Sequence, residues 1–109
     1  MLDTIELSKK LISFDSVTPA KQDIFDFLMG VFEENGFTTK QLNFDGDGSY
    51  EVINIMATYG PINTNGKHFN FLCHVDVVPP GNLEDWDTPP FEPTIKAVSY
   101  THLTLPTRD

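Results

Sequence analysis

A histidine and an aspartate two residues apart, His74 and Asp76, are the pair in this chain whose types and spacing best suit catalysis or metal binding. They follow a short apolar run, and Pro-Pro-Gly at residues 79–81 ends any strand that this run forms. Side chains two apart on a strand share a face, so the imidazole and the carboxylate would project together. A carboxylate beside an imidazole fixes its tautomer and raises its basicity, as it does for metal-bound histidines. The pair therefore suits a metal site, and the alternative is two polar residues that begin a surface loop.

Other residues capable of nucleophilic chemistry have weaker support. Cys73 precedes His74, but neighbours on a strand point to opposite faces, so His74 is badly placed to take the proton of the thiol. We expect Cys73 to be a buried structural cysteine. Ser16 and Thr18 have no base near them in the sequence, and their expected role is to cap the following helix.

Two helices are predicted ahead of the strands. The first covers residues 4–13, with Asp3 as its N-cap and a glutamate three residues later, as in a capping box. The second covers residues 19–35, with Thr18 as its N-cap, proline at its first position and Gly36 as its stop. Apolar residues recur at helical spacing in both segments, so each helix is expected to bury one face.

Strands are predicted after the helices. Residues 37–44 and 51–59 are typical of two strands, and the turn at residues 45–49 joins them as a hairpin. A third strand at residues 68–73 would lead directly into His74. The proline-rich loop after the pair carries Trp86 and Phe91, which we expect to hold it to the rest of the fold.

Composition excludes several classes of protein. A formal charge of −9 argues against a nucleic-acid partner, because phosphates are bound by Lys and Arg. No apolar run reaches the length of a membrane span, and no signal peptide opens the chain. A single cysteine suits a reducing compartment, and 39% hydrophobic residues with nine phenylalanines indicate a globular core. We therefore expect a cytoplasmic protein with no membrane partner.

Residues 74–96 carry a more specific signal than the His-x-Asp pair alone. They read HVDVVPPG at 74–81, then Trp86, then PPFEPTIK at 89–96. This pattern resembles the M20 family of metal-dependent amidohydrolases and peptidases, and the likeness runs from the N-terminus to about Lys96. The resemblance implies that His74 is a zinc ligand and that Asp76 is the catalytic carboxylate that orients it. Cys73 departs from the family, which usually has glycine before the histidine.

The resemblance also implies a fold and an activity. The expected fold class is α/β, the N-terminal fragment of a zinc-peptidase-like catalytic domain with two helices followed by a partly parallel mixed sheet. The implied substrate is a small N-acyl amino acid, and the likeness is greatest to the branch of the family that hydrolyses N-succinyl-diaminopimelate for lysine and diaminopimelate synthesis. The intact relative would use two ions, zinc or possibly cobalt or another divalent metal, and would be a homodimer. The alternatives are an acetylornithine deacetylase or a dipeptidase of the same family, or a non-catalytic binding module.

The last thirteen residues do not continue the family pattern. Residues 98–107 look like the translation of an adapter used in preparing sequencing libraries. We therefore expect residues 1–96 to be the truncated N-terminal part of an M20 catalytic domain and residues 97–109 to be a non-native tail. On this expectation the other metal ligands and the general base lie beyond the chain, and the chain alone is inactive.

Overall fold

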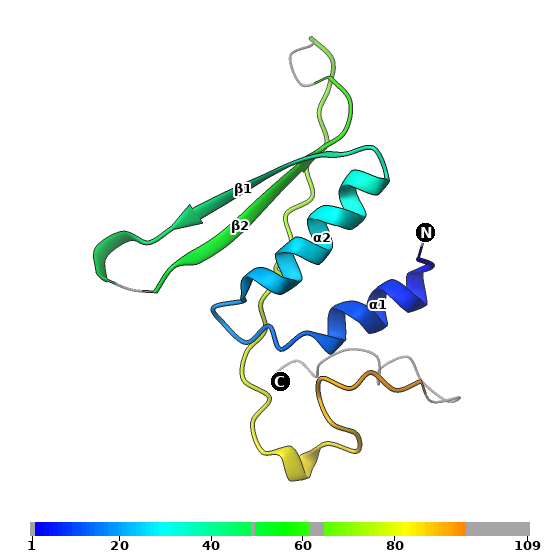
Figure 1. Ribbon diagram of the computed structural model, residues 1–109, viewed down its shortest axis with the longest axis vertical. Helices are drawn as coiled ribbons and strands as arrows, with labels where there is room; N and C mark the ends of the chain where they lie inside the picture. Colours follow the sequence, from blue (N-terminus) through cyan, green and yellow to red (C-terminus); the bar gives the residue numbers. More distant parts are fainter. Residues whose placement is uncertain (1, 49, 62–64, 96–109) are drawn as a thin grey trace.

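The computed structural model describes residues 2–48, 50–61 and 65–95. Helices α1 (Thr4–Ser13) and α2 (Gln22–Glu34) precede strands β1 (Thr38–Phe44) and β2 (Val52–Thr58), with short 3₁₀ helices η1 at Gly46–Gly48 and η2 at Leu83–Asp85. Figure 1 shows α2 between the β-hairpin and α1, with the chain after β2 passing behind α2 in this view. The α/β class expected from the sequence is confirmed.

Helix α1 begins where its capping residue predicts. Asp3 is the N-cap, and its Oδ1 accepts a hydrogen bond of 2.8 Å from the backbone N–H of Glu6. This bond satisfies one of the N–H groups that the first turn leaves without a helical partner. The helix ends at Ser13, as expected.

Helix α2 begins later than predicted, at Gln22 instead of Pro19. Its N-cap is Lys21, whose side chain makes no capping hydrogen bond. The expected cap, Thr18, lies outside the helix because its backbone N–H donates to the carbonyl of Val77 at 3.1 Å. Pairing with a segment far along the chain therefore outcompetes the local cap. The helix still stops where the sequence indicates, since Gly36 has a φ of 89°, which favours glycine.

The hairpin follows the predicted pattern. Its strands are antiparallel, with Thr38 opposite Thr58 at one end and Phe44 opposite Val52 at the other. Along β2, Ile53 and Ile55 are partly buried against the core, while Val52, Asn54 and Met56 are exposed. This alternation is what a half-buried strand requires.

The third strand predicted at residues 68–73 is not formed. Within the described residues the sheet has two strands, and this segment pairs with neither. Phe69, Phe71 and Leu72 are 81–94% exposed, and Cys73 is exposed as well, so the expectation of a buried structural thiol is also wrong. A strand needs a hydrogen-bonded neighbour and a surface to cover, and the described residues offer this segment neither. The sheet of the described residues is therefore antiparallel, and the expected partly parallel sheet is not seen in them. Val17 and Val77 form an isolated parallel bridge outside that sheet.

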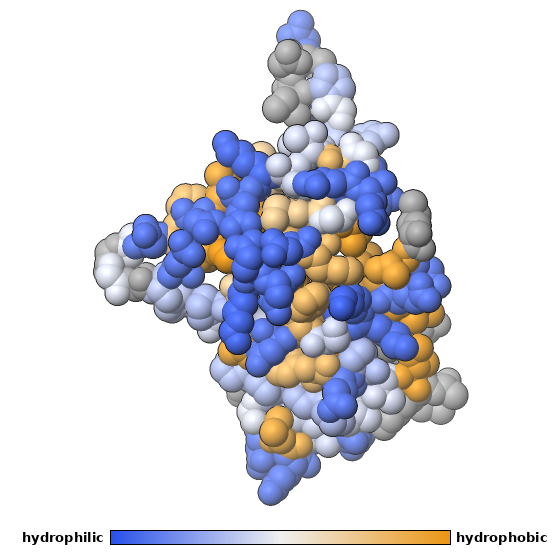
Figure 2. Space-filling model, viewed as in Figure 1, coloured by the Kyte–Doolittle hydropathy of each residue, from blue (hydrophilic) through white to orange (hydrophobic). Residues whose placement is uncertain are grey.

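The core is small and centred on the start of α2. Ala20, Ile24 and Phe25 are its buried apolar residues, and Ser16, a few positions earlier in the sequence, is a buried polar residue. Partly buried residues from α1, α2, the hairpin and the segment after it pack on this cluster: Leu11, Phe14, Leu28, Ile53, Ile55 and Val75. Figure 2 shows apolar side chains reaching the surface between polar ones. None of the described helices has the length and apolar character that a membrane span requires.

Candidate metal-binding histidine and its supporting residues

The structure brings the two predicted site residues together. His74 Nδ1 lies 3.3 Å from Asp76 Oδ1, at the long end of the range for a hydrogen bond. The His74 side chain is 93% exposed and that of Asp76 is 36% exposed. When the carboxylate accepts the Nδ1 proton, the lone pair of the imidazole is on Nε2. The exposed ring can then offer Nε2 to a metal ion.

Alternation along the backbone aims this pair outward. Val75, between His74 and Asp76, packs against the core cluster, so its two neighbours face away from it. Two backbone hydrogen bonds hold the end of the segment: Val77 N–H donates to the Ser16 carbonyl at 3.0 Å, and the Val77 carbonyl accepts from the N–H of Thr18 at 3.1 Å. The connection between α1 and α2 therefore fixes the place where Asp76 sits.

Thr18 is a site residue that the sequence reasoning missed. Its Oγ1 donates to Asp76 Oδ2 at 2.7 Å and also lies 3.3 Å from the Val77 carbonyl. The two residues are 58 positions apart, so local patterns point only to capping. The one available signal was Pro19, which favours an extended Thr18 that can pair as a strand does.

The Asp76 carboxyl is held in its charged form. The hydrogen bond from Thr18 is the largest influence and lowers its pKa below the ordinary value. Partial burial acts in the opposite direction, and His74 adds a smaller lowering through its hydrogen bond and its charge. Asp76 is therefore a carboxylate at neutral pH and can accept hydrogen bonds on both oxygens.

The donor set on this chain fits one ligand of a larger metal site. Across the described ranges, no three His, Cys, Asp or Glu side chains gather closely enough to hold an ion. Zinc sites use three or four protein ligands, and His74 is a single imidazole with an orienting carboxylate. The residues present thus suit a metal in their chemistry but not in their number.

The loop after the pair is closed by Trp86. Its indole N–H donates to the Pro80 carbonyl at 3.0 Å, next to the turn at Gly81 where φ is 78°. Asn82 caps η2 by accepting from the N–H of Glu84. Trp86 therefore holds the loop to the end of the 74–80 segment, and Phe91 is partly buried.

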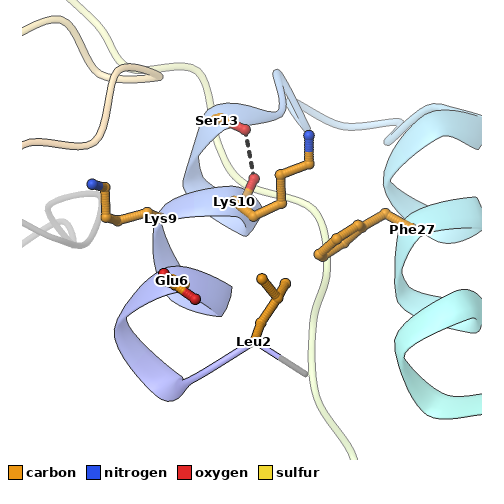
Figure 3. A pocket seen from close by; sticks show the side chains of 6 residues that line it. All are labelled: Leu2, Glu6, Lys9, Lys10, Ser13 and Phe27. Carbon is orange, nitrogen blue, oxygen red and sulfur yellow. Dashed lines mark hydrogen bonds between the residues drawn. The ribbon is translucent and has the colours of Figure 1, made fainter. Parts of the chain in front are cut away.

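A separate hollow lies between the two helices (Figure 3). It is open to solvent, with a volume of about 480 Å³. The ammonium group of Lys10 lies 5.7 Å from the ring centre of Phe27, which accounts for part of its lining. The hollow is lined by Leu2, Glu6, Lys9, Lys10, Ser13 and Phe27. None of these residues belongs to the 74–80 segment, so the hollow is not part of the candidate site.

Comparison with known proteins places the chain beside hydrolytic enzymes, although no family model matches it. It is 42% identical over 96 residues to a succinyl-diaminopimelate desuccinylase of Wolbachia from Brugia malayi, a match that covers 87% of this chain and 23% of the relative. Enzymes of the same name from Pelagibacter ubique and Methylococcus capsulatus are 44% and 41% identical over 84% and 88% of the chain.

These matches confirm the resemblance that residues 74–96 indicated. Over most of its own length the chain is a relative of succinyl-diaminopimelate desuccinylases. It spans about a quarter of the length of the curated relatives it matches.

Proposed function

We propose that this chain is the N-terminal part of a succinyl-diaminopimelate desuccinylase, a metal-dependent amidohydrolase. The observation that carries the proposal is an identity of 41–44% to enzymes of that name over 84–88% of the chain. The complete enzyme would hydrolyse the amide bond of N-succinyl-diaminopimelate in lysine and diaminopimelate synthesis. It would act in the cytoplasm as a homodimer.

His74 is the proposed metal ligand and Asp76 the carboxylate that orients it. A divalent metal bound there, zinc or cobalt and one of two in the complete enzyme, would polarise the amide carbonyl and lower the pKa of a water ligand. Asp76 keeps the proton of His74 on Nδ1. It would also stabilise the positive charge that the ring gains when the Nε2 lone pair binds a metal. The exposure of His74 supports this role, since a ligand nitrogen has to be reachable.

The rest of the site would come from the part of the enzyme that this chain does not span. A zinc-activated hydrolysis needs about three ligands and a general base, and the described residues bring together one ligand. We therefore expect the 109-residue chain to be inactive and to bind zinc weakly. Tight stoichiometric zinc uptake by this chain in a competition titration would contradict the ligand count.

The proposed catalytic domain has a partly parallel sheet of which this chain holds only a part. Two features support this: the parallel bridge between Val17 and Val77, and the extended 68–73 segment whose apolar side chains have no cover. In the complete domain, strands from the remaining three quarters of the enzyme would flank that segment.

The test uses the complete enzyme, made by extending residues 1–96 with the coding sequence that follows them in the source genome. It should turn over N-succinyl-diaminopimelate in preference to acetylornithine. His74→Ala should abolish measurable turnover, whereas the matched control His68→Ala, which changes an exposed histidine six residues earlier, should retain it. Asp76→Ala should lose about 10- to 100-fold in metal affinity or activity.

Two results would overturn parts of the proposal. Equal or better turnover of acetylornithine would replace the proposed substrate with that of the deacetylase branch. A His74→Ala enzyme with near-full activity would remove His74 from the metal site.

A further inference from the structure

The connection between α1 and α2 adds a third polar group to the His74–Asp76 pair. Thr18 Oγ1 donates to Asp76 Oδ2 at 2.7 Å, while Asp76 Oδ1 lies 3.3 Å from His74 Nδ1. Each oxygen of the carboxylate thus has its own partner. A hydrogen bond to one carboxylate oxygen hinders rotation of the carboxylate about the Cβ–Cγ bond of the aspartate. The direction of the other oxygen is therefore set as well.

The parallel bridge explains why these three side chains meet. Val17 and Val77 are partners in that bridge, so they share one face of the paired segments. Thr18 and Asp76, each next to a bridge residue, lie on the opposite face, as does His74 two residues before Asp76. Backbone geometry therefore delivers the hydroxyl to the carboxylate.

We propose that Thr18 is a positioning residue for His74, because its hydroxyl fixes the Asp76 carboxylate in the orientation that accepts the Nδ1 proton. The inference rests on the proposed role of His74 as a metal ligand. Thr18 would touch neither metal nor substrate, and would act through Asp76 on which nitrogen of His74 carries the proton.

A purely structural role for the hydroxyl explains the contacts less well. The segment is already fastened by two backbone hydrogen bonds, Thr18 N–H to the Val77 carbonyl and Val77 N–H to the Ser16 carbonyl. Any residue other than proline at position 18 can make the first of these bonds. The hydroxyl adds a 2.7 Å bond to Asp76 Oδ2 and a longer contact of 3.3 Å with the Val77 carbonyl, so its shorter bond is the one to the carboxylate.

The experiment compares three substitutions in the metal-free complete enzyme labelled with ¹⁵N-histidine. Thr18→Val removes the hydroxyl and keeps the branched shape, and Thr18→Ser keeps the hydroxyl. Thr39→Val is the matched control, because Thr39 donates its hydroxyl to the Glu33 carboxylate away from the pair. The readout is the ratio of the Nδ1–H and Nε2–H tautomers of neutral His74 by ¹⁵N NMR in alkaline solution, with zinc affinity as a second readout.

We expect Thr18→Val to lower the share of the Nδ1–H tautomer and to weaken zinc binding by roughly three- to tenfold, less than the loss typical of removing the orienting carboxylate itself. Thr18→Ser and Thr39→Val should match the unmodified enzyme in both measurements. If Thr18→Val disturbs folding, as seen by circular dichroism, Thr18→Ala against Thr18→Ser gives the same comparison.

An unchanged tautomer ratio and zinc affinity in the variants lacking the hydroxyl would overturn the proposal. If Asp76→Ala still shifts the tautomer ratio of His74 in that case, Thr18 has a purely structural role. The proposed roles of His74 and Asp76 then stand. If His74→Ala leaves zinc affinity and turnover intact, the proposed metal ligand itself is wrong, which is a separate outcome.

Discussion

At the scale of single residues, the candidate site depends on one carboxylate with two different partners. Asp76 receives the Thr18 hydroxyl on one oxygen and faces His74 with the other. The bond from Thr18 has the larger effect on the pKa of Asp76, which lies below its ordinary value. A hydroxyl donates a stronger hydrogen bond to a charged carboxylate than to a neutral carboxyl group, so this bond stabilises the charged form.

This lowered pKa predicts how the stability of the chain depends on pH. The Asp76 pKa is lower in the folded chain than in the unfolded one, so its stabilising effect is complete above the unfolded value of about 3.9. The effect is lost as pH falls through the lower folded value. The difference in unfolding free energy between the native chain and Thr18→Val should therefore be greatest above about pH 4 and should shrink in more acidic solution.

Urea unfolding at a series of pH values between about 2.5 and 7 measures this difference. Thr39→Val, which removes a hydroxyl from a different carboxylate, accounts for general effects of the substitution. A difference that grows as the solution is acidified would contradict the direction of the pKa shift.

At the scale of elements, the two helices differ in how their first turns are satisfied. Asp3 caps α1 through its side chain, whereas α2 begins after Lys21, whose side chain accepts nothing from the first turn. Thr18, the best local candidate to cap α2, is instead committed to Asp76. Packing of Ile24 and Phe25 into the core therefore stabilises α2, while Lys21 contributes no side-chain cap.

A side-chain cap can be supplied at the position that lacks one. Lys21 has extended backbone angles, φ −90° and ψ 170°, which suit an N-cap serine. We expect Lys21→Ser to be more stable than Lys21→Ala by about 1 kcal/mol, because only serine can accept from the N–H groups of the first turn. Both variants remove the same charge, so thermal or urea unfolding isolates the cap. Equal stabilities would mean that α2 does not begin at Gln22.

At the scale of the whole molecule, the chain has more apolar surface than its core can cover. Ala20, Ile24 and Phe25 are its buried apolar residues among those described, while Phe69, Phe71 and Leu72 are more than 80% exposed. The backbone of this extended segment is also unpaired with either strand of the sheet. Exposed apolar side chains on an unpaired extended segment favour association between molecules.

We therefore expect the 109-residue chain to associate as its concentration rises. Leu72→Lys places a charge in the exposed segment and should lower the sedimentation-derived average mass at a given concentration. Leu83→Lys is the matched control, because Leu83 is 62% exposed but lies in η2, away from that segment. A chain that remains monomeric and melts reversibly in one sharp transition would contradict this prediction.

The local features of this protein were determined by its sequence. Asp3 starts α1, Gly36 ends α2, and the hairpin follows from two apolar alternating runs around a short turn. These features depend on residues within a few positions of one another, so patterns of capping, glycine and alternation are enough to find them. The His74–Asp76 pairing has the same origin, since side chains two apart on an extended backbone must share a face.

Only the tertiary structure decided the role of Thr18 and the fate of the 68–73 segment. As a cap, Thr18 would serve one local N–H group, whereas pairing with Val77 satisfies its backbone and gives its hydroxyl to a carboxylate 58 residues away. The 68–73 run has the composition of a buried strand, but a strand forms only against a partner, and the residues described here supply none. Both outcomes depend on which distant segments are available for pairing, a property that no local pattern contains.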